Sequence, residues 1–146
     1  MEQQVQQVLS NSESQPEINH VPPHLLEKVW DLVEPGLRKV LEFDSEGRGP
    51  EDILKAMLEE REFMTLAFRG DDFMGFTVSW IERPYKWHVD LLYSEDNLLE
   101  AFPLLEDAAR QEGASIMIFG SQRKGFKRLA KQLGFSEAYV SYRKDL

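Results

Sequence analysis

The sequence contains no cysteine and no long apolar run, and both absences narrow what the protein can be. Without cysteine there is no disulfide and no thiolate ligand for a metal, which fits a reducing compartment. No apolar run approaches the roughly 20 residues of a membrane-spanning helix. The first residues also lack the basic, apolar and small-residue order of a secretory signal. We therefore expect a cytoplasmic protein.

Basic residues are scarce as well. The chain has 17 Lys and Arg against 26 Asp and Glu, a formal net charge of -9. A surface of that sign repels nucleic acid unless a local basic patch dominates. What is present is a chain of 146 residues, 42% hydrophobic and 11% aromatic, which suffices for one domain with its own core. We predict one folded domain with neither a membrane nor a nucleic acid as its partner.

Residues 1–22 differ in composition from the rest. They are rich in Gln, Ser, Asn and Glu, and Val5, Val8 and Leu9 have only weak helical spacing. Two interpretations stay open: a disordered polar arm, or a segment that docks on a neighbouring subunit. Because Pro22 and Pro23 end this stretch, we divide the chain into an arm over 1–22 and a domain over 23–146.

Hydrophobic periodicity predicts the elements of that domain. Helical spacing covers 24–33 and 51–60, and Pro35-Gly36 separates the first of these from a short helical piece over 37–43. A later helix starts after Ser94–Asn97 and ends near Gly113, and Pro103 within it predicts a kink or a late start. The remaining predicted elements are strands over 63–69, 73–83, 87–93, 115–119 and 137–144, and a helix over 124–133. This order predicts an α/β (α+β) domain with a mixed, mostly antiparallel sheet flanked by helices.

Three short segments resemble one protein family. Asp107-Ala-Ala-Arg-Gln-Glu-Gly113 resembles the end of the central helix of GNAT N-acetyltransferases, and Leu129–Phe135 resembles their Leu-Tyr-x-x-x-Gly-Phe segment. Gly120-Ser-Gln-Arg-Lys-Gly-Phe126 resembles the Gly-Arg-x-Gly-Trp segment of small GNAT-like proteins encoded by bacteriophages. The order of elements over residues 21–146 is also similar to the GNAT fold. The resemblance implies that fold and, for an active member, acetyl-CoA as cofactor.

The chain departs from the family at the cofactor loop. GNAT enzymes hold the pyrophosphate of acetyl-CoA with an Arg/Gln-x-x-Gly-x-Gly/Ala loop before the central helix. Here that place is taken by Ser94-Glu-Asp-Asn97, with no glycine and two carboxylates. Two unit charges ~4 Å apart near a surface interact by roughly 4 kcal/mol, whereas a helix N-terminus contributes about 0.3–1 kcal/mol. Ser94 and Asn97 are the candidate cofactor contacts; the alternative is that these residues only cap the helix. We expect no cofactor, or acetyl-CoA if the protein is an enzyme.

The catalytic residues that the resemblance implies are also incomplete. Many GNAT enzymes have a tyrosine general acid four residues before the Gly-Phe pair, and Ala130 stands at that position. Tyr139 and Tyr142 would act there only with a different geometry, and the alternative is that both are ordinary sheet residues.

The candidates for a general base, if the protein is active, are Glu82, His88 and Asp90. His88 and Asp90 fall on one face of a strand and would form an oriented acid–base pair, or merely a polar pair on a wet face. The three histidines have no metal-ligand spacing, so we assign no metal.

One basic cluster stands out in this acidic chain: Arg123, Lys124, Lys127, Arg128 and Lys131. It is either a solvated helix face or a surface that docks on an acidic partner subunit; contact with nucleic acid would want more aromatic residues between the charges than Phe126.

Three functional interpretations follow. The first is a non-catalytic GNAT-like protein, encoded by a phage and acting as a structural or assembly component, in which case it is also virion-associated. The second is an active N-acetyltransferase with an unusual cofactor loop. The third is a module that inhibits a host factor through its acidic surface. In the first, the arm and the basic helix contact other protein subunits.

Overall fold

The computed structural model describes residues 15–120 and 125–146. Five strands form one sheet in the order β1-β2-β3-β4-β5: β1 (Pro16–Val21), β2 (Phe63–Arg69), β3 (Asp72–Glu82), β4 (Lys86–Ser94) and β5 (Ile116–Phe119). Neighbours pair antiparallel except β4 and β5, which are parallel. The helices are η1 (Pro23–Leu25), α2 (Leu26–Leu41), α3 (Pro50–Leu58), η2 (Leu98–Ala101), α4 (Phe102–Gln111) and α5 (Phe126–Gln132). The mixed, mostly antiparallel sheet is confirmed.

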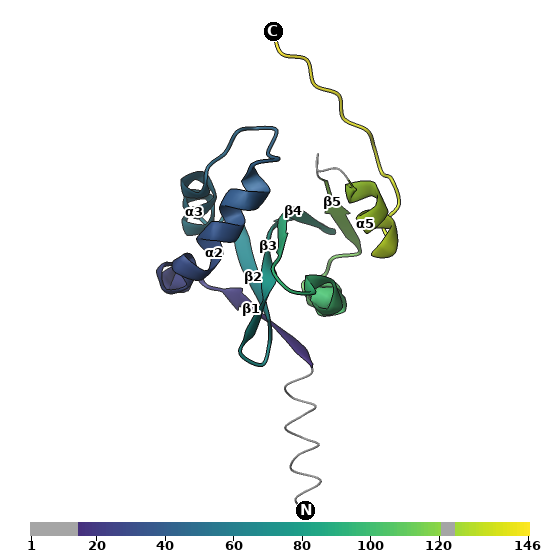
Figure 1. Cartoon of the computed structure of the whole chain (residues 1–146). Helices are drawn as coiled ribbons and strands as arrows, with labels where there is room; N and C mark the ends of the chain where they lie inside the picture. The colour runs from purple at the N-terminus through teal and green to yellow at the C-terminus, as the bar shows by residue number, and fades with distance from the viewer. Residues whose placement is uncertain (1–14, 121–124) are drawn as a thin grey trace, which may run out of the picture.

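Helices cover both faces of the sheet (Figure 1). Helices α2 and α3 pack on one face, around Met64, Phe76 and Val78. On the opposite face, η2 and α4 pack over the sheet, with Phe102 and Leu105 of α4 beside Trp87 of β4. The middle of β3 is therefore buried on both faces, so its core residues form a continuous run and do not alternate with exposed positions.

The predicted break at Pro35-Gly36 is wrong, because α2 continues through both residues. Pro35 gives up one backbone hydrogen bond, but the helix is amphipathic and buries Val33, Leu37 and Leu41 against the sheet. Gly36 has a packing role, since a Cβ there would lie 2.5 Å from Cδ2 of Tyr93. Burial of the apolar face outweighs the local penalty at Pro35.

The N-terminal arm is shorter than the sequence predicts. Residues 16–21, which the prediction left in the arm, form β1 and pair along their whole length with β2. Nδ1 of His20 lies 2.7 Å from Oγ1 of Thr65 across this pair. The strand owes its order to the neighbouring β2, which no local pattern in 16–21 reveals. Residues 1–14, where the docking arm was predicted, lie outside the described residues.

The connection between β4 and α4 follows the prediction. The segment after β4 forms the short η2 helix, and α4 then begins at Phe102 with Pro103 in its first turn. The late start is confirmed, because proline lacks the N–H that an interior helical position would use. Helix α4 ends before Gly113, whose φ of +91° is the left-handed conformation that glycine adopts most easily.

The predicted last strand over 137–144 is wrong. Residues after α5 have no regular structure and run away from the body of the molecule as an extended tail (Figure 1). Tyr139, Val140 and Tyr142 are all exposed. A strand needs a neighbour to satisfy its backbone groups, and no described strand lies against this segment. No helix in the described ranges is long and apolar enough to cross a membrane.

We predict that Gly36→Ala lowers the free energy of unfolding by about 1–3 kcal/mol, because the new methyl group overlaps the Tyr93 ring. Urea denaturation measures this loss. In the Tyr93→Leu background the same substitution should cost much less, because the ring is gone. An equal cost in both backgrounds would contradict the packing role of Gly36.

Candidate functional site

The strands β4 and β5 pair over only part of their length. Lys86–Val89 lie beside Ile116–Phe119, after which β5 ends and β4 continues to Ser94. At the same level β4 shifts register against β3: Val78 lies opposite Leu91 and Ser79 opposite Val89. Asp90 therefore has no residue opposite it on β3 and forms a β-bulge. A bulge bends its strand. The ladder between β4 and β5 therefore ends at Val89 and Phe119, and the carboxyl ends of parallel strands are where open α/β sheets commonly bind ligands.

Arg48, from the loop between α2 and α3, joins this bulge to the helical layer. Its two Nη atoms donate to Asp90 at 2.8 and 3.0 Å. Its Nε and Nη2 donate to Asp44 at 3.1 and 2.9 Å. The side chain of Arg48 is 23% exposed and that of Asp44 7%. The guanidinium fork matches both carboxylates, so the three side chains form a rigid clamp.

The clamp shifts the pKa of Arg48 and that of Asp44. Hydrogen bonds to Asp90 and Asp44 raise the pKa of Arg48 above its usual range. Burial acts to raise the pKa of Asp44, but the hydrogen bonds and charge of Arg48 outweigh it and lower that pKa. Arg48 and Asp44 therefore both stay charged throughout the neutral pH range.

Glu62 lies beside the clamp and behaves differently. Burial, followed by the hydrogen bond and charge of Asp90, raises its pKa to about 8. Its side chain is only 11% exposed, and its nearest cation, Nη1 of Arg48, is 3.7 Å from Oε1. Oε2 is buried without a hydrogen-bond partner among the described residues. Glu62 also lines a pocket of about 230 Å³ formed with Val21, Pro23, Met57, Glu60 and Phe63.

His88 and Asp90 do not form the predicted acid–base pair. Asp90 is taken by Arg48, and the ring of His88 stacks on Trp80 with 3.8 Å between ring centroids. Nε2 of His88 lies 3.3 Å from Oε1 of Glu82, close enough for an ion pair but not aligned as a hydrogen bond. Within residues 15–120 and 125–146, no group of three or more His, Asp and Glu is placed to hold a metal. The structure thus brings His88 to Glu82 and leaves Asp90 apart.

The loop after β4, where the family resemblance implies a cofactor contact, bonds its backbone donors within the chain. The N–H groups of Glu95 and Asp96 both donate to the carbonyl of Met74, at 2.9 and 3.0 Å. The N–H of Leu98 donates to Oγ of Ser94 at 3.2 Å. Asn97 has a φ of +48° and its side chain makes no capping hydrogen bond. Because these donors are already bonded within the chain, few remain to hold a pyrophosphate.

The predicted residues of the last quarter lie away from this region. Ala130 is half-buried on α5, and Tyr139 and Tyr142 stand on the exposed tail with 72% and 91% of their surface accessible. Neither tyrosine is placed as a general acid near β4.

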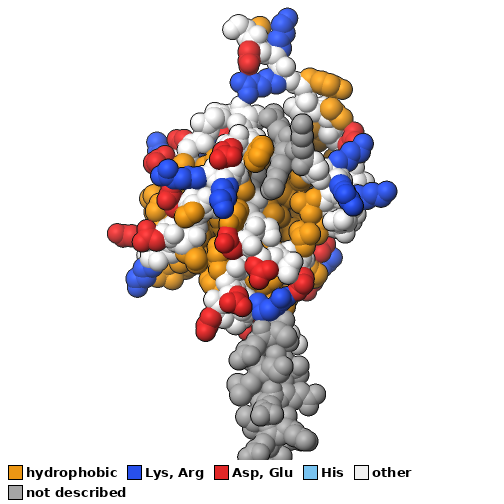
Figure 2. Space-filling model, in the orientation of Figure 1, with side chains coloured by type: hydrophobic (Ala, Val, Ile, Leu, Met, Phe, Trp, Pro, Cys, Tyr) orange, Lys and Arg blue, Asp and Glu red, His pale blue; other side chains and the backbone are white. Residues whose placement is uncertain are grey.

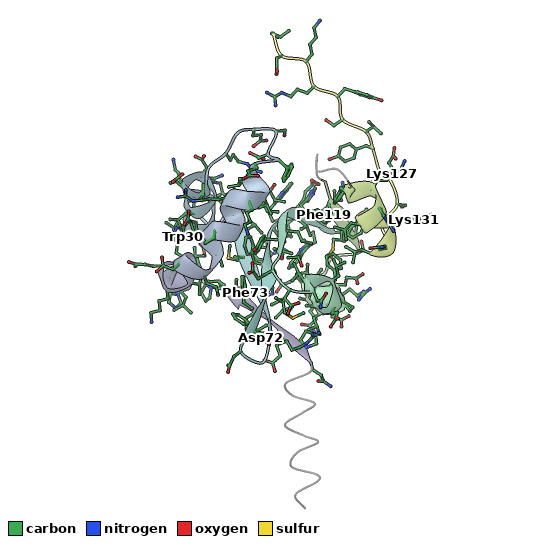
Figure 3. The ribbon with its side chains drawn as sticks, viewed as in Figure 1. Trp30, Asp72, Phe73, Phe119, Lys127 and Lys131 are labelled. Carbon is green, nitrogen blue, oxygen red and sulfur yellow. The ribbon has the colours of Figure 1, made fainter. Side chains whose placement is uncertain are left out.

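The basic cluster is partly described. Lys127, Arg128 and Lys131 are exposed on α5, and no other described residue forms an ion pair with them. Figure 3 shows Lys127 and Lys131 projecting from the outer side of α5, and Figure 2 shows Lys and Arg side chains gathered on that side of the molecule. Arg123 and Lys124 lie outside the described residues. The described part of the cluster is a solvent-facing cationic surface.

The sequence analysis identified neither the clamp nor Glu62 beside it. Arg48 lies in a Gly- and Pro-containing loop that reads as a simple connection, and Asp90 is 42 positions away. The one local signal was the spacing of Asp44 and Arg48, which suits a pair on one turn of chain. Nothing near Glu62 in the sequence marks its side chain as buried, because its neighbours Val21, Arg48 and Asp90 are distant along the chain.

The sequence matches no family model, and no curated protein matches it significantly. Solved structures are similar over nearly the whole chain. A ribosomal-protein-alanine N-acetyltransferase from Brucella melitensis biovar Abortus 2308 superposes with a TM-score of 0.66 at 14% identity, covering 90% of this chain and 99% of that one. An integron cassette protein from V. cholerae has a TM-score of 0.64 at 14% identity, covering 89% and 92%. The aminoglycoside N-acetyltransferase AAC(6')-Iy, in complex with CoA, has a TM-score of 0.54 at 16% identity, covering 91% and 97%. The chain therefore has the fold of GNAT acetyltransferases.

We predict that Arg48→Met lowers the free energy of unfolding by about 2–3 kcal/mol, because the partly buried carboxylates of Asp44 and Asp90 lose their charged hydrogen bonds. Chemical denaturation at pH 7 measures the loss. The matched control is Arg110→Met, since Arg110 pairs with Asp107 on an exposed helix surface and its loss should cost less than about 0.5 kcal/mol. Similar costs for the two variants would contradict the clamp.

We predict that Glu62 makes the protein less stable as the pH rises. Its pKa is about 8 in the folded chain and near the ordinary 4.5 when unfolded, so between these values only the folded state holds the proton. Stability then falls with rising pH by up to about 1.4 kcal/mol per pH unit. Denaturation at pH 5 and pH 8 should show a smaller difference for Glu62→Gln than for the unchanged protein. Glu60→Gln, at an exposed neighbour, should leave the difference as it is.

Proposed function

We propose that this protein uses the acetyltransferase fold without acetyl-CoA chemistry, and that it acts as a structural or assembly component by binding other protein subunits. The observation that carries the proposal is the state of the loop after β4. Met74 accepts the N–H groups of Glu95 and Asp96, so the backbone donors that would meet a pyrophosphate are already bonded inside the chain.

Charge at this loop supports the same conclusion. Glu95 and Asp96 place two carboxylates where an anionic cofactor would have to lie, and Glu95 accepts a hydrogen bond from the hydroxyl of Tyr93. The first turn of α4 offers one donor fewer, because Pro103 has no N–H. The residues present do not fit the pyrophosphate of acetyl-CoA.

The polar side chains near the bulge are also occupied. Both carboxylate oxygens of Asp90 accept hydrogen bonds from Arg48. Glu62 is protonated at neutral pH, so it cannot accept a proton from a substrate. A general base needs a free acceptor within reach of the substrate. The pair of Arg48 and Asp90 serves instead to bind the loop between α2 and α3 to the sheet.

The charge distribution supports binding to other subunits. The exposed cations Lys127, Arg128 and Lys131 lie on one helix and suit an acidic surface of another subunit. The rest of the chain, whose net charge is -9, suits a basic surface. The resemblance of residues 120–126 to phage-encoded proteins makes a virion the specific assembly that we propose.

An active N-acetyltransferase is the second candidate, favoured by one observation. Glu62, with a pKa of about 8, lies beside the bulge and lines a pocket of about 230 Å³ together with Glu60. A carboxyl group with a raised pKa is typical of an acid–base catalyst, and two acidic side chains suit an amine acceptor.

Titration with acetyl-CoA separates the two candidates. Calorimetry should show no binding up to millimolar cofactor, and the melting temperature should not change. The doubly substituted Glu95→Gln, Asp96→Asn chain removes the repulsion but keeps the hydrogen bonds to Met74, so it should remain unable to bind. Micromolar binding by the unchanged protein, with release of CoA when an amine is added, would overturn the proposal and support the enzyme.

A further inference from the structure

The pocket of about 230 Å³ that Glu62 lines lies where α3 ends and β2 begins. Val21, at the end of β1, and Pro23, at the start of η1, form the other side. Among the described residues, none from β4, from β5 or from the Ser94–Asn97 loop lines it. Its volume is below the roughly 300–1,000 Å³ of ordinary small-molecule sites, so it suits a single side chain better than a cofactor.

The walls of the pocket are apolar and its polar groups are two carboxyls. Val21 and Met57 are 7% and 1% exposed, and Pro23 and Phe63 complete the apolar part. Glu60 and Glu62 supply the acidic part, and no described basic side chain lines the pocket. Such a lining suits an occupant with an aliphatic stem that ends in a positive charge.

One of these carboxyls has an oxygen that nothing in the described chain satisfies. Oε1 of Glu62 faces Arg48, with 3.7 Å to Nη1. Oε2 is buried and has no hydrogen-bond partner among the described residues. Buried polar atoms are nearly always hydrogen-bonded, so an unpaired acceptor in the wall of a pocket indicates a donor that comes from outside the chain.

The second carboxyl, that of Glu60, is held in an unusual backbone conformation. Glu60 has a φ of +58°, a left-handed value that residues other than glycine adopt at a cost and that is frequent at binding sites. Its carboxylate forms no ion pair within residues 15–120 and 125–146, whereas that of its neighbour Glu59 lies 3.4 Å from Nε of Arg61. Glu60 is therefore available to a cation that enters the pocket.

The charge around Glu62 is out of balance. One cation, Arg48, lies within 4.0 Å of four carboxyl groups, those of Asp44, Glu46, Glu62 and Asp90. Burial and Asp90 raise the pKa of Glu62 to about 8, against the opposing charges of Arg48 and Arg61. At neutral pH a proton on Glu62 thus takes the place of a second cation.

We propose that this pocket binds an arginine side chain of a partner protein, with the guanidinium on Glu60 and Glu62 and the stem against the apolar walls. A guanidinium fork can bond two carboxylates at once, as Arg48 does with Asp44 and Asp90 in the same cluster. It also stays charged when it is buried, and arginine is frequent at the centre of protein interfaces.

The inference rests on the proposed function for the nature of the partner, another protein subunit, and adds the chemistry that recognises it. It differs from the acetyltransferase candidate in the occupant. An amine acceptor must lose its charge to react, whereas the guanidinium remains a cation and binds without reaction.

NMR titration of the full chain with Nα-acetyl-arginine amide tests the pocket, because the guanidinium is the only charge of this probe. We expect a dissociation constant on the order of 1 mM at pH 7.5, as for one well-placed side chain. Nα-acetyl-citrulline amide has nearly the same shape without the charge and should bind at least about tenfold more weakly. Equal binding of the two probes, or no binding of the arginine probe at roughly twentyfold higher concentration, would overturn the proposal.

Three matched substitutions locate the charge. Glu62→Gln and Glu60→Gln should each weaken binding of the arginine probe by about fivefold or more, because each removes one partner of the guanidinium. Glu59→Gln removes the same charge from a residue that does not line the pocket, so it should change the affinity by less than about twofold. Unchanged circular dichroism spectra serve as the folding control. Equal effects of all three would mean that only the net charge acts, against the proposal.

The pH dependence shows whether the guanidinium replaces the proton of Glu62. The other charged groups that face Glu62 are Asp90 of β4, Arg48 of the loop between α2 and α3, and Arg61 beside it. Below pH 8 the affinity for the arginine probe should rise by up to about tenfold per pH unit, because binding requires the ionised form of Glu62. The Glu62→Gln chain should lack this rise. An affinity of the unchanged chain that is independent of pH would place the guanidinium elsewhere and exclude the proposed site.

The acetyl-CoA titration keeps this inference separate from the proposed function. A chain that binds both the arginine probe and acetyl-CoA would support the pocket and overturn the non-catalytic function. A chain that binds neither would overturn the pocket and leave that function standing.

Discussion

The one-residue bulge at Asp90 in β4 determines how this strand contributes to the two cores of the protein. Before Asp90, the buried side chains of this strand, Trp87 and Val89, belong to the core under α4. After it, Leu91 belongs to the core under α2 and α3. A strand shows the same face every second residue, so only an insertion in the register allows one strand to serve both cores in this way. The insertion leaves a carboxylate at the junction, and Arg48 neutralises it from the helical layer.

The ladder between β4 and β5 ends at the level of the same irregularity. β4 runs on past Val89 whereas β5 stops at Phe119, so the pairing of the two parallel strands ends directly before the bulge. In the acetyltransferases with which this chain shares its fold, the architecture is the same, and AAC(6')-Iy has been solved with CoA bound. Fold does not determine function, however, because activity depends on the groups that line the site. Here two backbone N–H groups of the loop after β4 donate to the carbonyl of Met74, and the loop carries two carboxylates.

The two ends of the described chain show how much a strand depends on its neighbour. Residues 16–21 carry no local strand signal, yet they are ordered as β1 because β2 offers a complete ladder. Residues 137–144 have a clearer pattern, yet they form no strand, because no strand among the described residues pairs with them. Backbone groups of a strand are satisfied only across a pair, so local sequence predicts the capacity for a strand and not its formation.

The sequence by itself determined the class of fold and most of its elements. Helical and alternating periodicities located α3, β2, β3, β4 and the late start of α4, because these depend on nearest neighbours along the chain. It also determined the chemistry of the loop at Ser94–Asn97, since missing glycines and added carboxylates are visible without a structure. Only the tertiary structure decided that α2 continues through Pro35, that Arg48 meets Asp90, and that Glu62 is buried beside them. Each of these arises from contact between segments far apart in the chain, where burial and charge pairing override what the local residues favour.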